Sequence, residues 1–175
     1  YRIFAMTGHP CEYPLADESK IAGYQLPANT FSTPTQKQEL AEHVAKVKEY
    51  GYCKMGWISI FERMHALRQF EDIPMDLYDD STEINLLADR LVEFQAREIA
   101  DYLEAGVDGI QFGDDFGTTT SMLLSPERWR EFFKPRYRQL MAPIKAAGKQ
   151  IFFHTCGCSR EILPDLKEIG VDAIW

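Results

Sequence analysis

The sequence of 175 residues lacks the features that mark several classes of protein. It has no cluster of lysine and arginine and its net charge is −8, so nucleic acid and anionic membranes are poor partners. No apolar run approaches the roughly 18 residues of a membrane span, and no signal-peptide pattern is present. We therefore expect no nucleic-acid or membrane partner.

Cysteine is also scarce. The four cysteines (11, 53, 156 and 158) are too few and too unevenly spaced for a disulfide scaffold. Together with the missing signal peptide, this usage predicts a reducing, cytoplasmic location. Hydrophobic residues make up 45% and charged residues 26%, which is typical of a globular domain with a real core.

The hydrophobic pattern predicts short strands that alternate with helices. The predicted strands are 1–6, 52–61, 109–112, 150–154 and the start of one at 172–175. The predicted helices are 35–50, 62–70 (ended by 71–74), 80–104, 125–147 with a break or kink at Pro135, and 159–169. Residues 9–34 are predicted to form a long loop with a short helix near 17–22.

Two segments, 104–110 and 168–174, share the pattern E-x-G-V-D-x-I, which predicts a helix end, a glycine turn and a strand start in each. Repeated units of this kind build a parallel α/β sheet or a (β/α)8 barrel. A full barrel takes roughly 250 residues. The predicted fold class is therefore α/β, a partial (β/α)8 TIM barrel with about five of eight β/α units over residues 1–175. Both ends lie inside apolar runs, so we expect a longer polypeptide.

The predicted strand 150–154 leads into His154-Thr155-Cys156-Gly157-Cys158. Residues i and i+2 of a strand point to the same side, so the imidazole of His154 and the thiol of Cys156 can meet. This donor pair suits zinc. Other interpretations remain open at this point: a hydrogen-bonded structural histidine, and two cysteines that form a redox pair or are inert.

Active sites of such barrels lie at the carboxyl ends of the strands. In this sequence those ends carry Thr7 and His9, Phe61 and Glu62, Asp114 and Asp115, and His154 with Cys156. Asp114 and Asp115 are the catalytic candidates, and because adjacent strand residues point opposite ways, only one should face the site. It would orient His154 or bind a polar part of the substrate, unless the pair caps the following turn.

Four stretches resemble the uroporphyrinogen decarboxylase superfamily. They are Glu104–Asp115, Ser125–Pro135, His154–Gly157 and Gly170–Ile174, and the resemblance covers roughly residues 50–175. Within the superfamily, His-x-Cys-Gly resembles the corrinoid-dependent methyltransferases. Those are (β/α)8 enzymes that move a methyl group from a methylated corrinoid protein to a thiol such as coenzyme M.

The resemblance implies a Zn²⁺ ion held by His154, Cys156 and a further cysteine that would lie beyond Trp175. Cys158 would replace that cysteine only if its loop folds back. The resemblance also implies methylcobalamin, presented by a partner corrinoid protein, and a small thiol or similar acceptor. A homo-oligomer is compatible with the open edges of a partial barrel.

Two alternatives remain. The true decarboxylases of the superfamily work without a metal, through an aspartate and a tyrosine, and bind substrate carboxylates with an arginine-rich motif that is not found here. The other alternative is a non-catalytic partial barrel that acts only as a piece of a larger assembly.

Overall fold

The structure is a computed structural model of the chain, and it describes residues 3–4, 9–10 and 12–175. Its short amino-terminal elements are β1 (Ile3–Phe4), β2 (His9–Pro10) and the 3₁₀ helix η1 (Glu18–Lys20). The central elements are α1 (Pro34–Lys48), β3 (Lys54–Ile58), α2 (Phe61–Leu67), α3 (Asp72–Asp79), α4 (Thr82–Glu104) and β4 (Gly109–Gly113). The last elements are α5 (Pro126–Ala146), β5 (Gln150–His154), the 3₁₀ helix η2 (Arg160–Ile162), α6 (Leu163–Glu168) and β6 (Ala173–Ile174).

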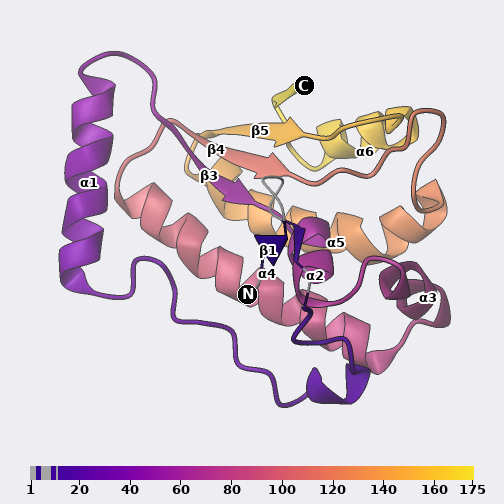
Figure 1. The fold of residues 1–175 in the computed structure, drawn as a ribbon. Helices are drawn as coiled ribbons and strands as arrows, with labels where there is room; N and C mark the ends of the chain where they lie inside the picture. The colour runs from indigo at the N-terminus through magenta and orange to yellow at the C-terminus, as the bar shows by residue number, and fades with distance from the viewer. Residues whose placement is uncertain (1–2, 5–8, 11) are drawn as a thin grey trace.

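Four strands form a parallel sheet in the order β3-β4-β5-β6, with α4 and α5 running beneath it (Figure 1). The order of strands in the sheet follows their order in the chain, without the reversal that marks a doubly wound sheet. Sequential parallel strands are the arrangement of a barrel wall. The sheet is therefore consistent with part of a (β/α)8 barrel.

The two faces of the sheet have different environments. On one face, the rings of Phe112 and Phe153 pack on Tyr137 of α5, with centroids 6.3 and 5.4 Å away. On the other face, the ring of Phe152 contacts Tyr52 and Trp175, which are each about half exposed. Alternation along β5 thus places one set of side chains in the core and the other on an open aromatic face.

The repeated E-x-G-V-D-x-I pattern performs the same structural role twice. Its glycines, Gly106 and Gly170, follow α4 and α6 closely and have φ values of 83° and 111°, which favour glycine. Each of its aspartates accepts two kinds of hydrogen bond, one from a backbone N–H at or beside the neighbouring strand and one from a lysine ammonium group. Asp108 accepts from the Cys53 N–H and Lys48, and Asp172 accepts from the Ile151 N–H and Lys145. The predicted sequence of helix end, glycine turn and strand start is confirmed.

The parallel sheet has four strands in the described part of the chain, and not the five predicted. Of the predicted strand 1–6, residues 3–4 form β1, which pairs antiparallel with β2 in a separate sheet. Residues 1–2 and 5–8 lie outside the described residues. The α/β class and the partial-barrel prediction are confirmed by the remaining strands.

Two predictions about proline were only partly right: a helix does end before the segment 71–74, at Leu67, and Pro135 does not break α5. The segment 71–74 does not simply end a helix, because α3 begins at Asp72 and places Pro74 in its first turn, where a backbone N–H has no partner to lose. Helix α5 continues through Pro135, with Phe132, Phe133 and Tyr137 buried on either side of it. Packing of these rings offsets the cost of proline in a helix, about 3 kcal/mol.

None of the helices in the described residues combines the length and the apolar composition needed to cross a membrane.

Candidate metal centre

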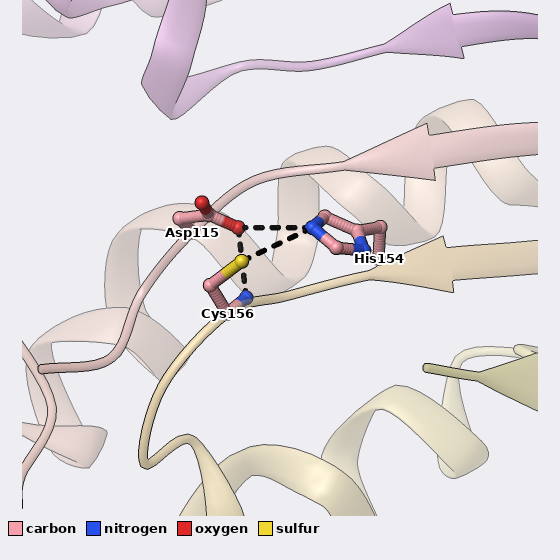
Figure 2. Close-up of side chains that lie close together, drawn as sticks. All are labelled: Asp115, His154 and Cys156. Atoms are coloured by element: carbon pink, nitrogen blue, oxygen red, sulfur yellow. Dashed lines mark hydrogen bonds and ion pairs between the residues drawn. The ribbon is translucent and has the colours of Figure 1, made fainter. Parts of the chain in front are cut away.

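Three side chains of types that can hold a metal ion converge at the carboxyl ends of β4 and β5 (Figure 2). Asp115 follows β4, His154 ends β5, and Cys156 lies two residues further on. We call them the His154 cluster. One donor atom from each lies within 4.8 Å of the other two. The structure brings the side chains of His154 and Cys156 together, as predicted, and places Asp115 beside them.

The distances within the His154 cluster are short. Nε2 of His154 lies 3.2 Å from Sγ of Cys156 and 3.6 Å from Oδ1 of Asp115. The same Oδ1 accepts a hydrogen bond of 2.8 Å from the backbone N–H of Cys156. One nitrogen, one sulfur and one oxygen donor therefore face a common point, which is a donor set that zinc accepts.

The charges around Cys156 suit a bound cation better than a free thiolate. The hydrogen bond to Asp115 raises the pKa of the Cys156 thiol, burial raises it further, and the negative charges of Asp115 and Glu62 act in the same direction. A thiol in such surroundings stays protonated at neutral pH and is a poor nucleophile. A divalent cation would reverse this, because a coordinating thiol is deprotonated outright.

Two tryptophan rings flank the imidazole of His154. The ring centroids of Trp57 and Trp175 lie 5.7 and 5.8 Å from that of His154. Nε2 faces the His154 cluster, whereas Nδ1 is buried and has no hydrogen-bond partner in the described residues. The orientation of the ring is thus held by the two indoles and by the contact of Nε2 with Sγ of Cys156.

Glycine at position 113 makes room for one of these rings. A Cβ atom there would overlap the indole of Trp57. Gly113 pairs with His154 in the sheet register, so the strand end carries no side chain between the indole and the imidazole.

The two loops that follow β4 and β5 are packed backbone to backbone. Gly157 has φ of 76°, and a Cβ on it would overlap the backbone of Gly117, while a Cβ on Gly117 would overlap the backbone at 157–158. The N–H of Cys158 donates to the carbonyl of Thr118 at 2.7 Å. This contact holds Cys156 near Asp115. Cys158 is not part of the His154 cluster, so its predicted substitution as a ligand has no geometric support among the described residues.

Asp114, the other catalytic candidate, is fully buried and has a different set of partners. Its oxygens accept from the backbone N–H groups of residues 60–62 at 2.7, 3.1 and 2.7 Å, from Oγ of Ser59 at 2.7 Å, and from the hydroxyl of Tyr137. Helix α2 begins at these N–H groups and has no cap from its own N-cap side chain. Asp114 therefore caps α2 from the neighbouring loop. Burial raises the pKa of Asp114, while the hydrogen bonds that it accepts oppose that shift.

Adjacent aspartates thus divide as the strand alternation predicted, with one facing the core and one the site. Sequence reasoning could not tell which, because the answer depends on where α2 begins. The structure places Asp115 in the site and Asp114 beneath it.

Glu62 and Trp57 were not assigned roles from the sequence. From the sequence, Glu62 was placed at the carboxyl end of a predicted strand. Because barrel active sites lie at those ends, its position could have identified it as a site residue. Its half-buried carboxylate accepts from Nε1 of Trp57 at 3.4 Å, and burial, then the charge of Asp114, raises its pKa. Trp57 had no signal beyond its place in a predicted strand.

Comparison with known proteins agrees with this architecture. Residues 40–175 match the uroporphyrinogen decarboxylase (URO-D) family. No curated protein matches the sequence. Among solved structures, a methyltransferase from Methanosarcina mazei is similar in fold, with a TM-score of 0.70 at 20% identity.

That alignment covers 97% of this chain and 48% of the solved chain, so this chain spans about half the length of the methyltransferase. At this identity the similarity shows a shared fold. The family match extends over most of the sequence and includes every residue of the His154 cluster. The chain therefore belongs to the uroporphyrinogen decarboxylase (URO-D) family.

Proposed function

We propose that this chain carries the zinc site of a methyltransferase that moves a methyl group from a methylated corrinoid protein to a thiol or a similar acceptor. The observation that carries the proposal is the separation of 3.2 Å between Nε2 of His154 and Sγ of Cys156 at the strand ends. The fold shared with a methyltransferase from Methanosarcina mazei supports it.

Zinc bound here would keep the sulfur of an incoming thiol deprotonated and oriented for attack on a methyl carbon. His154 would serve as a neutral ligand through Nε2, in an orientation held by the flanking rings of Trp57 and Trp175. Cys156 would bind as the thiolate and release its own proton.

Glu62 would act on the proton of the substrate. Its raised pKa makes its carboxylate a better proton acceptor than an exposed glutamate, and its charge is felt at Cys156. The carboxylate would therefore take up the proton that the acceptor thiol loses. The corrinoid would supply the methyl group and would keep the electron pair of the bond to it, so the transfer would need no oxidant or reductant.

The decarboxylase alternative finds less support. It calls for an aspartate and a tyrosine that reach the substrate. Asp114 and Tyr137 are in contact with each other, but both side chains have no exposed surface. Asp114 is also fully engaged as the cap of α2.

The proposal is tested by methyl transfer in the intact protein. Zinc-loaded protein is mixed with methylcobalamin and a panel of small thiols, and loss of the methylcobalamin absorbance is followed. We expect thiol-dependent demethylation that His154→Ala abolishes. Demethylation at an equal rate in His154→Ala would contradict the proposal.

A further inference from the structure

We propose that Asp115 is a direct metal ligand, so that this chain supplies three ligands of its own: one nitrogen, one sulfur and one oxygen. The inference rests on the proposed zinc site and adds Asp115 to the ligands His154 and Cys156. The resemblance implied a third ligand beyond Trp175, whereas the structure has a third donor atom already beside the first two.

The separations fit a tetrahedral ion. Zinc lies roughly 2.0–2.1 Å from nitrogen, 2.3 Å from sulfur and 2.0–2.2 Å from oxygen. Two ligands at a tetrahedral angle are then about 3.4–3.6 Å apart. The observed distances from Nε2 of His154, 3.2 Å to sulfur and 3.6 Å to oxygen, are close to these values. Each of these two separations therefore needs to change by only a few tenths of an ångström to hold an ion, and the third donor pair, sulfur and oxygen, lies within 4.8 Å.

The carboxylate of Asp115 is held in place without a metal. Its Oδ1 accepts the N–H of Cys156 at 2.8 Å, which ties the β4 loop to the β5 loop. The preceding residue, Asp114, is anchored by the start of α2, so the backbone that carries Asp115 is fixed as well. The side chain of Asp115 is 41% exposed, which leaves its oxygens accessible to an ion.

The charge and softness of this donor set have a chemical consequence. One thiolate and one carboxylate neutralise Zn²⁺, as two thiolates would. A carboxylate is a harder donor than a thiolate and gives less electron density to the metal. The fourth position would therefore remain strongly attractive to a soft thiolate, which is the substrate that the proposed function requires.

Cobalt(II) substitution in the intact protein tests this inference, because a thiolate ligand produces a charge-transfer band in the near ultraviolet. We would measure cobalt and zinc affinity in wild type, Asp115→Asn, Asp115→Cys and the control Asp79→Asn. Asp79 is an exposed residue at the end of α3, far in sequence from the His154 cluster.

We expect Asp115→Asn to weaken zinc binding by more than about 100-fold, beyond the 10–100-fold typical of residues that only support a ligand. Asp79→Asn should bind as wild type. Asp115→Cys should restore binding and increase the charge-transfer intensity by one thiolate's contribution. Wild-type affinity in Asp115→Asn, or no added intensity in Asp115→Cys, would overturn the inference.

The design separates this inference from the proposed function. If Cys156→Ser loses the charge-transfer band while Asp115→Asn binds normally, the zinc site stands and the role of Asp115 is refuted. If wild type shows no thiolate band at all, both fail.

Discussion

Replacing Asp114 with asparagine should destabilise the protein strongly, because this one carboxylate accepts five hydrogen bonds in the core. Three come from the N–H groups of residues 60–62, and two come from the hydroxyls of Ser59 and Tyr137. The change in Asp114→Asn is small in volume and removes one acceptor atom and the charge. Its effect therefore reports on the hydrogen bonds and not on packing.

The magnitude follows from the geometry. In the best orientation the amide oxygen takes the place of Oδ2, and the new NH₂ faces the N–H of Glu62, which loses its acceptor. A buried donor left unpaired costs about 1–3 kcal/mol, and each remaining bond loses about 0.5–1.5 kcal/mol of charge assistance. With three bonds kept at the amide oxygen, the expected loss is about 3–7 kcal/mol, out of a total stability of about 5–15 kcal/mol.

Urea unfolding of Asp114→Asn, followed by tryptophan fluorescence, measures this loss. The neighbouring variant Asp115→Asn is the matched control, because its amide oxygen can still accept the N–H of Cys156 and its side chain is partly exposed. With zinc removed by a chelator from all the proteins compared, we expect it to lie within about 1 kcal/mol of wild type. If Asp114→Asn also stays within that range with an unchanged m-value, the carboxylate does not hold the start of α2.

Two further predictions concern the site's packing and the repeated aspartates. Gly113→Ala should displace the indole of Trp57 and weaken zinc binding, and zinc affinity equal to wild type would contradict the packing role of this glycine. For Asp172, partial burial alone would raise the carboxyl pKa, but Lys145 and the Ile151 N–H outweigh it and the pKa is lowered. A lowered folded pKa stabilises the fold above the unfolded value near 3.9 and loses that effect as pH falls below it. Asp172→Asn should therefore lower the melting temperature at pH 7 and have little effect near pH 2, whereas an equal deficit at both would refute this account.

Much of the fold follows from local sequence signals. The helix predicted over 80–104 is present as α4, and Ile84, Leu87 and Leu91, which recur at helical spacing, are all buried in it. The helix start at Ser125 is confirmed by its Oγ, which accepts the N–H of Arg128 at 3.1 Å. These signals are local, because a cap or a buried stripe is encoded within a few turns.

The errors arose where tertiary contacts decide. Pro135 lies in an unbroken helix because its neighbours are buried on both sides. The predicted start of the helix 80–104 is also displaced: Ser81 caps α4, while Asp80 adopts a left-handed conformation with φ of 53° at the end of α3. The intervening α3 had not been predicted, so neither had this junction.

The site was partly predictable, because part of it depends on local sequence signals and part on a distant contact. The alternation of a strand brought His154 and Cys156 together, and it required one of two adjacent aspartates to join them. The choice of Asp115, and the burial of Asp114, depend on a helix that begins more than fifty residues earlier. No local pattern records that contact.

The zinc content of the intact protein tests the central claim most directly. We expect about one zinc per chain in wild type, and none above background in the double variant His154→Ala, Cys156→Ala, which removes the pair that lies 3.2 Å apart. The control Asp79→Asn should retain the metal. Full zinc retention in the double variant would contradict the assignment of these residues as ligands.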